Sequence, residues 1–268
     1  MKNKFLLFIV TLLFLSFFQN VYATGTGTVS PKHIFSKGYI VVNISDNTII
    51  AQKNSNRIYP IASITKLMNA VIATENIDLS KTITLTPEML QTGGHSPSLF
   101  ANLTISGKDL LKACLIQSTN DAANALTYFI DPKKFLDLMN QKAKELGMDN
   151  TSFADAYGLS PNNHSTANDL VKLLSYIYKN HPEILAITKE NNFWLPDPSG
   201  KLLHFENVNN LYRNPDFIGA KAGYIPQSKQ TLASVALVNG KPIAIVLLNS
   251  KHRREDALRM VNLLKKSI

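Results

Sequence analysis

Strand-like segments lie at both ends of this chain, and helical segments fill the middle. Five segments are rich in β-branched, aromatic or other apolar residues and are bounded by polar turns. They are residues 39–44, 48–51, 217–223, 231–238 and 242–248. Asn239-Gly240, between the last two, is a strong signal for a tight hairpin turn. Because an unpaired strand leaves its backbone polar groups without partners, we expect the two ends of the chain to meet in one five-stranded antiparallel sheet.

The middle of the chain has apolar residues at helical spacing. Helices are predicted at residues 109–117, 121–129, 132–146 and 166–178, and an earlier helix begins at or near Ser63. A final helix has an apolar face formed by Ala257, Met260, Val261, Leu264 and Ile268. The expected fold class is therefore α/β (α+β). The antiparallel five-stranded sheet would be covered by helices on both faces, with a mostly helical insertion at about residues 61–185.

The first residues are ordered as in an export signal. Two lysines within residues 1–4 precede an almost wholly apolar run at residues 5–18, and Val21-Tyr22-Ala23 follows as a site that a signal peptidase can cut. The run is shorter than the roughly 18 to 20 residues that a membrane-spanning helix needs. We therefore expect a signal peptide at residues 1–23, with no transmembrane anchor left after its cleavage.

The rest of the chain is expected to form a flexible leader at residues 24–33 and a single domain at residues 34–268. The whole sequence has a net charge of +9, with the positive residues scattered along it. Such a distribution suits an anionic surface such as a cell wall. No basic stripe is interleaved with aromatic residues, so nucleic acid is not an expected partner. The single cysteine, Cys114, cannot form an internal disulfide and is expected to be a small buried apolar residue.

A serine and a lysine stand one helical turn apart in Ser63-Ile64-Thr65-Lys66. A serine hydroxyl becomes a good nucleophile only when a base takes its proton, and a partly desolvated lysine has a pKa low enough to do so. The pair lies at a helix start, where the helix dipole favours developing negative charge. Ser63 is thus the candidate nucleophile and Lys66 its base, although a cap serine with a solvated lysine gives the same spacing.

The pattern Ser-x-Asn occurs three times. Two copies, at Ser45 and Ser160, lie in turns, and turn formation explains them. The third, Ser118-Thr119-Asn120, interrupts two apolar helical runs, where inward-facing polar side chains would otherwise be costly. In that place Ser118 could pass a proton to or from Lys66, and Asn120 could hold a substrate amide.

Lys221-Ala222-Gly223 lies within a predicted strand. A glycine inside a strand often marks the close approach of a ligand or of another backbone segment. Lys221 adds a cation for a substrate carboxylate, although a solvent-facing lysine is the simpler interpretation of this motif alone.

Together the motifs occur in the order Ser-x-x-Lys, Ser-x-Asn, Lys-x-Gly, which resembles the signature of the serine penicillin-recognising enzymes. Within that group the chain is most similar to the low-molecular-mass D-alanyl-D-alanine carboxypeptidases and endopeptidases. The closer likeness rests on motifs within residues 60–68, 118–123, 147–153, 158–160 and 165–170. The resemblance spans roughly residues 34–265, and it implies a penicillin-binding/β-lactamase-like fold with one transpeptidase-like catalytic domain.

This resemblance implies a serine-type D,D-peptidase that cleaves D-alanyl bonds of peptidoglycan stem peptides or cross-bridges through an acyl-enzyme on Ser63. Lys66 would be the general base, and Ser118 would relay the proton to the leaving amine. The substrate-binding residues would be Asn120, Lys221, Ala222, Gly223 and Tyr224. Backbone N–H groups of Ser63 and Tyr224 would form the oxyanion hole. No metal or cofactor is implied, β-lactams would acylate Ser63 as covalent inhibitors, and the exported protein would work in a periplasm.

Ala222 stands where the family pattern has a threonine. Loss of a hydroxyl that bonds to a charged group, worth about 1.5 to 3 kcal/mol, would weaken recognition of a terminal carboxylate without abolishing the chemistry. This departure puts a terminal carboxypeptidase role and sensitivity to penicillin in doubt, and leaves cleavage of cross-links open. The end of the sequence soon after its last helix likewise resembles the endopeptidase branch. A catalytically weak penicillin- or peptidoglycan-binding protein is the alternative that Ala222 invites.

Two other classes of serine enzyme are alternatives. A serine β-lactamase shares the three motifs but needs a further glutamate to activate the deacylating water. Glutamates in the right interval are Glu145, Glu183, Glu190 and Glu206, and none has a matching loop context. A Ser-His-Asp hydrolase is not expected, because Gly94-His95-Ser96-Pro97-Ser98 fails the Gly-x-Ser-x-Gly pattern at its last position.

Overall fold

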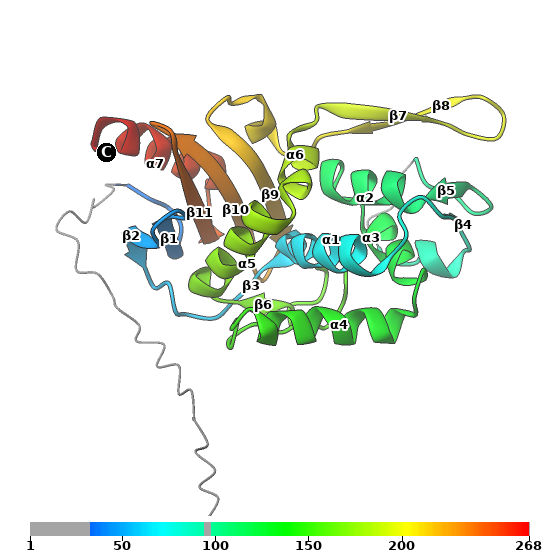
Figure 1. Ribbon diagram of the computed structural model, residues 1–268, viewed down its shortest axis with the longest axis horizontal. Coiled ribbons are helices and arrows are strands. Elements are labelled where there is room, and N and C mark those ends of the chain that lie inside the picture. The colour runs from blue at the N-terminus through cyan, green and yellow to red at the C-terminus, as the bar shows by residue number, and fades with distance from the viewer. Residues whose placement is uncertain (1–32, 94–97, 268) are drawn as a thin grey trace, which may run out of the picture.

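One antiparallel sheet of five strands organises the protein, as predicted, in the order β2-β1-β11-β10-β9 (Figure 1). The strands are β1 (Gly38–Asn43), β2 (Thr48–Lys53), β9 (Phe217–Ile225), β10 (Lys229–Val238) and β11 (Lys241–Ser250). This computed structural model describes residues 33–93 and 98–267. The expected signal peptide at residues 1–23, nearly all of the leader and Ile268 lie outside the described residues.

The two ends of the chain meet where β1 pairs with β11. Val41 lies opposite Ile245 in this antiparallel pair, so the first strand occupies the interior of the sheet beside the last one. β10 and β11 are joined through Asn239 and Gly240, whose φ angles of 49° and 78° lie in the left-handed region that a two-residue hairpin turn needs. The five-stranded sheet therefore forms only when strands from the two ends of the chain pair with each other.

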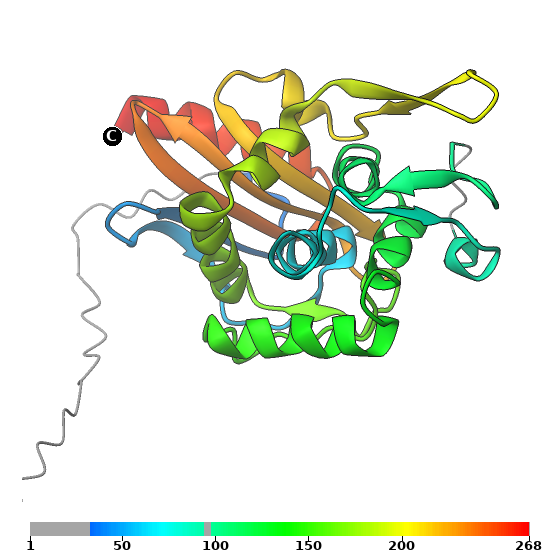
Figure 2. The same ribbon diagram turned by 45° about the vertical axis from the view of Figure 1, so that its right-hand side comes forward.

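Helices cover both faces of the sheet, as predicted. α5 (Ala167–Asn180) packs on one face and α7 (Arg253–Ser267) on the other (Figures 1 and 2). Along β10 the side chains alternate between the two layers, so that Val235 joins the core on the α5 side and Leu232 joins the core on the α7 side. Because both faces are covered, the strands are apolar on both sides instead of alternating with polar residues.

The other helices form a layer beside β9 (Figure 2). They are α1 (Thr65–Asn76), α2 (Gly107–Ile116), α3 (Asn120–Thr127), α4 (Pro132–Glu145) and α6 (Pro182–Lys189). The ends of α2 to α5 differ from the predicted helix ends by no more than two residues. The apolar spacing after Ser63 predicts one buried face for α1, but every residue from Thr65 to Ala73 is buried because other helices surround it. The centre of this layer therefore contains Lys66.

Short elements complete the connections. The paired strands are β3 (Tyr59–Pro60) with β6 (His164–Ser165), β4 (Thr82–Thr84) with β5 (Thr104–Ser106), and β7 (Asn192–Pro196) with β8 (Leu202–Glu206). The 3-10 helices are η1 (Ala62–Ile64), η2 (Glu88–Leu90) and η3 (Asn210–Arg213). The β7–β8 hairpin extends past α2 and was not predicted (Figure 1). Stacked aromatic rings hold its strands together, with the Trp194 and His204 centroids 4.0 Å apart.

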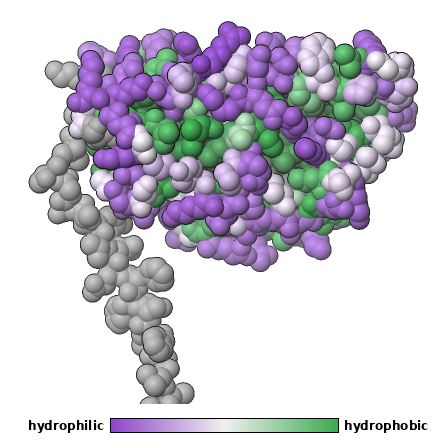
Figure 3. Space-filling model, turned by 45° about the horizontal axis from the view of Figure 1, so that its top comes forward, coloured by the Kyte–Doolittle hydropathy of each residue, from purple (hydrophilic) through white to green (hydrophobic). Residues whose placement is uncertain are grey.

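Hydrophilic side chains cover most of the face shown in Figure 3, and apolar side chains form a broken band among them. Within the described ranges, no helix combines the length and the apolar character that crossing a bilayer takes.

Candidate active site

Ser63 lies in η1, where the chain turns sharply from β3 into the central helix α1. The turn depends on Ala62, whose φ of 49° is uncommon for a residue with a side chain. It is fixed to the sheet because the buried hydroxyl of Thr231 on β10 donates to the carbonyl of Ile61 at 3.0 Å. Ser63 itself is half-buried. The candidate nucleophile therefore lies just before α1 on a strained backbone turn, which the hydrogen bond from Thr231 attaches to the sheet.

Lys66 is 0% exposed, and its amine has three oxygen partners. Nζ lies 3.2 Å from Oγ of Ser63 and donates to Oδ1 of Asn120 at 2.7 Å and to the carbonyl of Tyr157. The predicted Ser-Lys pair is therefore formed, and Asn120 contacts it from the first residue of α3. These partners orient the amine toward the serine hydroxyl.

Ser118 and Lys221 are joined across the same site. Ser118 occupies the break between α2 and α3 with a φ of 61°, and Lys221 reaches it from β9. Nζ of Lys221 lies 2.6 Å from Oγ of Ser118 and 3.2 Å from the carbonyl of Ala222, and the side chain is 2% exposed. The structure therefore places the three sequence motifs together, although they come from distant parts of the chain.

β9 is one of the two edge strands of the sheet, and its outer edge near Ser63 is available to a ligand. The N–H of Ala220 donates to Oγ1 of Thr188, and its carbonyl accepts from Nδ2 of Asn209, each at 3.0 Å. The backbone groups of Ala220 therefore point out from this edge. Since backbone direction alternates along a strand, the N–H of Tyr224 points out from the same edge.

The remaining predicted substrate-binding residues have contrasting surroundings on β9. Gly223 lies so close to Ser63 that a Cβ on it would be 2.7 Å from the backbone nitrogen of Ser63, and only glycine permits this approach. Ala222 is buried in the core beneath α7. The side chain of Tyr224 is 60% exposed, so its backbone is the part that lies at the site.

Burial lowers the pKa of both lysines. Desolvation lowers the pKa of Lys66 to about 8. Desolvation, followed by repulsion from the nearby charge of Lys66, lowers the pKa of Lys221 to about 7. Because the charge of Lys66 acts on Lys221, the two amines titrate as a coupled pair that holds roughly one proton near neutral pH, mainly on Lys66. Either lysine can therefore act as a base while the other remains charged.

Asp155 organises the loop that contacts Lys66, and this role was not predicted from the sequence. Its carboxylate accepts from the backbone N–H of Tyr157 at 2.9 Å and from that of Ser160 at 2.6 Å. The loop then presents the Tyr157 carbonyl to Lys66. Gly158, in the same loop, has a φ of 91° and lies against the carbonyl of Ala62, where a Cβ would be only 2.3 Å away. An Asp followed by a glycine three residues later is a turn signal that could have indicated this loop.

Arg253, at the start of α7, is a further cation at the site that was not predicted from the sequence. Its Nη1 donates to the carbonyl of Gly223 at 2.9 Å, and burial lowers the pKa of its guanidinium. Its positive charge also contributes to lowering the pKa of Lys221. The site therefore has a second fixed positive charge beside Lys221, on the side of β9 where Ala222 lies.

Cys114 is buried, as predicted. Burial raises the pKa of its thiol to about 11, so the thiol stays protonated beside the two lysines. Within residues 33–93 and 98–267, no three His, Cys, Asp or Glu side chains are grouped as metal ligands would be.

The glutamates that a β-lactamase would need make their contacts elsewhere. Glu145 pairs with Lys142, Glu183 contacts His181, and Glu190 pairs with Lys112. Glu206 is exposed at the end of β8. None of these contacts involves Ser63, Lys66 or Ser118.

Comparisons with known proteins agree with this geometry. The sequence profile of the D-alanyl-D-alanine carboxypeptidase family matches residues 25–252. A D-alanyl-D-alanine endopeptidase of Escherichia coli (strain K12) is 36% identical over 234 residues, covering 83% of this chain and 74% of that protein. The crystal structure of a D-alanyl-D-alanine carboxypeptidase from Mycobacterium tuberculosis H37Rv is 25% identical, with a TM-score of 0.82 over 89% of this chain and 94% of that one. Penicillin-binding protein D2 from Listeria monocytogenes, in its cefotaxime-bound form, is 26% identical, with a TM-score of 0.77 over 88% and 99% of the two chains. The chain belongs to the D-alanyl-D-alanine carboxypeptidase family.

Proposed function

We propose that this protein is a serine-type D,D-peptidase, which cleaves D-alanyl bonds of peptidoglycan stem peptides or cross-bridges through an acyl-enzyme on Ser63. The observation that carries the proposal is the 3.2 Å contact between Oγ of Ser63 and the fully buried amine of Lys66. A desolvated lysine beside a hydroxyl is an arrangement that activates a serine nucleophile. The bond is inferred from the relatives, which are a D-alanyl-D-alanine endopeptidase and a carboxypeptidase.

In acylation, neutral Lys66 takes the proton of Ser63 as Oγ attacks the carbonyl carbon of the D-alanyl bond. The carbonyl oxygen becomes an oxyanion, and the backbone N–H groups of Ser63 and Tyr224 stabilise it by about 3 kcal/mol. Gly223 keeps β9 close enough to Ser63 for one oxygen to reach both donors.

The C–N bond then breaks, and the leaving amine needs a proton. Ser118 supplies it, because its oxygen accepts from Lys221 and its own hydrogen can turn toward the substrate. Lys221 replaces the proton of Ser118. Lys66 holds the proton taken from Ser63, and Lys221 has given up its own. The two lysines therefore still share one proton, which now lies on Lys66.

Deacylation reverses this transfer. Water attacks the ester carbonyl and gives its proton through Ser118 to Lys221, which is then the neutral member of the pair. Lys66 returns its proton to Oγ of Ser63 as the ester bond breaks. The enzyme regains the reactive arrangement with neutral Lys66 and charged Lys221, which is the less populated of the two one-proton arrangements because Lys221 has the lower pKa.

A carboxylate on the leaving side would meet Lys221 and Arg253. Ala222 adds no hydroxyl there, which weakens recognition of a terminal carboxylate and favours cross-linked substrates. Asn120 would bind the substrate amide, but Nδ2 of Asn120 donates to the Gly93 carbonyl at 2.9 Å and its Oδ1 accepts from Lys66. Substrate would therefore replace the contact with Gly93 while Asn120 continues to hold Lys66.

The proposal extends to location and inhibitors. Residues 1–23 have the order of an export signal, which supports work in a periplasm on peptidoglycan. The cefotaxime-bound penicillin-binding protein among the similar structures supports β-lactams as covalent inhibitors that acylate Ser63.

Incubation with uncross-linked pentapeptides and with cross-linked muropeptides tests the function. We expect chromatography to show products from at least one substrate, and none with Ser63→Ala. If the folded protein yields no product from either, the enzyme proposal fails and the weak binding protein is favoured. Fast multiple turnover of nitrocefin would instead favour a β-lactamase.

A further inference from the structure

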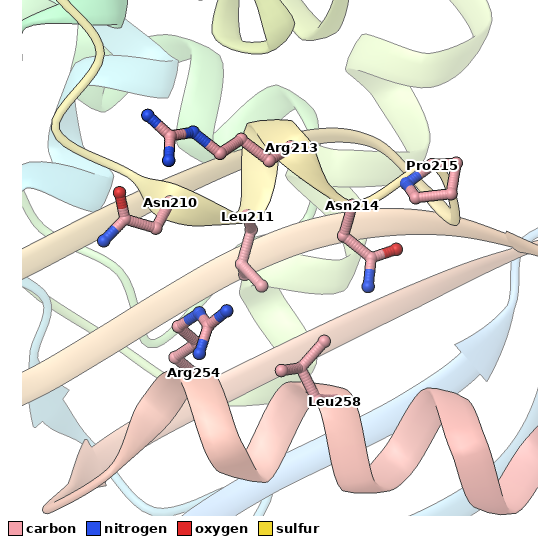
Figure 4. A pocket seen from close by; sticks show the side chains of 7 residues that line it. All are labelled: Asn210, Leu211, Arg213, Asn214, Pro215, Arg254 and Leu258. Carbon is pink, nitrogen blue, oxygen red and sulfur yellow. The ribbon is translucent and has the colours of Figure 1, made fainter.

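A polar pocket of about 560 Å³ lies between η3 and the first turns of α7, outside the site described above (Figure 4). The guanidinium of Arg254 extends from α7 toward η3. The side chains of Asn210 and Asn214 project from η3 and the residue after it, and those of Leu211 and Leu258 supply apolar walls. The pocket is therefore amphipathic, with its hydrogen-bond donors gathered around one guanidinium.

These donors are unused. Within the described residues, the guanidinium of Arg254 has no hydrogen bond or ion pair, and the amide NH₂ groups of Asn210 and Asn214 have no acceptor. Oδ1 of Asn214 accepts from the N–H of Asp216. Asp216 does not neutralise the pocket, because it pairs with Lys265 at 2.7 Å. An unpaired guanidinium with free amide donors beside it matches a carboxylate.

Arg213 adds to the positive field at the rim. Its Nε donates to the hydroxyl of Tyr212 at 2.7 Å and its guanidinium lies over the same ring, so the side chain is held without an acidic partner. The pocket thus has two positive charges and no paired acid among its lining residues. An anion is the expected occupant.

The pocket lies on the leaving-group side of Ser63, given the proposed function. In that reaction the oxyanion lies at Tyr224, and Lys221 serves the leaving amine through Ser118. Continuing along β9 from Tyr224 past Lys221 leads to Ala220. The outward carbonyl of Ala220 accepts a hydrogen bond from Asn209, the residue immediately before η3. A leaving group that continues along this edge therefore approaches η3.

The α7 wall of the pocket also adjoins the site. Arg254 directly follows Arg253, which donates to the carbonyl of Gly223. An extended peptide spans about 3.5 Å per residue, so a leaving stem peptide of several residues is long enough to continue along β9 past Ala220 toward η3.

We propose that this pocket binds a carboxylate of the second stem peptide when a cross-link is cleaved. A terminal substrate releases one D-alanine, whose single carboxylate stays beside Lys221 and Arg253 and does not reach Arg254. A cross-linked substrate releases a whole stem peptide, which has further carboxylates. The pocket thereby gives selectivity for cross-links and offsets the hydroxyl that Ala222 lacks.

Binding to Ser63→Ala protein tests the pocket without turnover. The ligands are a cross-linked muropeptide with free carboxylates on the leaving-side stem and the same molecule with those carboxylates amidated, compared by titration calorimetry. We expect the free form to bind about tenfold more tightly, as one charge-assisted pair would give. Adding Arg254→Glu should remove this difference, and adding Arg259→Ala, an exposed cation of α7 outside the pocket, should keep it.

Equal affinity for the two forms, or a difference that survives Arg254→Glu, would overturn the pocket assignment. Hydrolysis by the protein with Ser63 intact is measured separately. If both forms bind with equal affinity and are cleaved with equal kcat/KM, the proposed function is supported and the pocket assignment is wrong. A preference in binding with no hydrolysis of either form keeps the pocket and defeats the proposed function.

Discussion

Nζ of Lys221 donates to Oγ of Ser118 at 2.6 Å across 103 residues of sequence. This contact fixes the break between α2 and α3 against the edge strand β9 and places both polar groups in a buried region. In such surroundings charges interact strongly, so Lys221 also responds to the state of Lys66. The proton that the two lysines share is the basis of the proposed reaction.

The pH dependence of kcat/KM tests that pair. At low pH both amines are protonated and Lys66 cannot accept a proton from Ser63. At high pH both are neutral and Lys221 cannot attract a carboxylate. With pKa values of about 7 and about 8, the maximum should lie near neutral pH. A profile that keeps rising to the ordinary pKa of a lysine would show that Lys66 is not the base.

Thermal melts over the same range separate chemistry from unfolding. Both lysines have lower pKa values in the folded protein than in the unfolded chain. Above about pH 8 the unfolded chain therefore binds more protons, and this pair makes the folded state more stable as pH rises toward the unfolded pKa. We expect the fall in activity on the alkaline side to occur while these two groups still increase stability.

The sheet could be predicted from sequence because its strands are apolar on both faces and only two groups of strands exist to pair. The burial of Lys66 could not, because it depends on helices that surround α1 from distant parts of the chain. Asp155 and Arg253 were missed because they act on backbone groups, namely the N–H of Tyr157 and the carbonyl of Gly223. A motif search finds side chains that do chemistry, and it passes over those that position a loop or a strand.

Replacing Ala222 with threonine should restore recognition of a terminal carboxylate. The new hydroxyl would lie near Arg253 on the same side of β9, and it should raise the acylation rate by a labelled penicillin and the kcat/KM for a D-alanyl-D-alanine pentapeptide by about tenfold. Ala222→Val is the matched control, since valine has the shape of threonine without the hydroxyl. Equal rates for the two variants would mean that shape, not the hydroxyl, limits carboxylate recognition.

Asp155→Asn should alter the pH profile as well as the rate. The negative charge of Asp155 raises the pKa of Lys66, so its removal should shift the kcat/KM profile to lower pH. The amide also provides one acceptor where the carboxylate provides two, which should loosen the loop and lower kcat/KM about tenfold. Asp197→Asn is the control, because Asp197 accepts from backbone N–H groups of Ser199 and Lys201 in the distant β7–β8 hairpin. If kcat/KM falls but the pH profile does not move, Asp155 has a purely structural role.

Gly158→Ala should displace Ser63. Gly200→Ala is the matched control, because it measures the loss of unfolding free energy that a positive φ alone causes. Both glycines have positive φ, 91° at Gly158 and 83° at Gly200, so alanine should cost each about 1 to 2 kcal/mol of unfolding free energy. At Gly200 nothing lies within 4 Å of the added methyl group. At Gly158 the methyl group would be 2.3 Å from the carbonyl oxygen of Ala62 and 2.9 Å from the backbone nitrogen of Ser63.

Relief of that overlap has to move the segment that contains the nucleophile and one oxyanion donor. We therefore expect Gly158→Ala to lose about 1 to 3 kcal/mol more than Gly200→Ala in urea unfolding. Its acylation rate should fall at least about a hundredfold, because loss of one oxyanion donor alone has that effect. Gly200→Ala should acylate at the normal rate. If the two variants acylate equally fast, the loop at Gly158 does not fix the position of Ser63, and its contribution to the chemistry would then come from the contact between the Tyr157 carbonyl and Lys66.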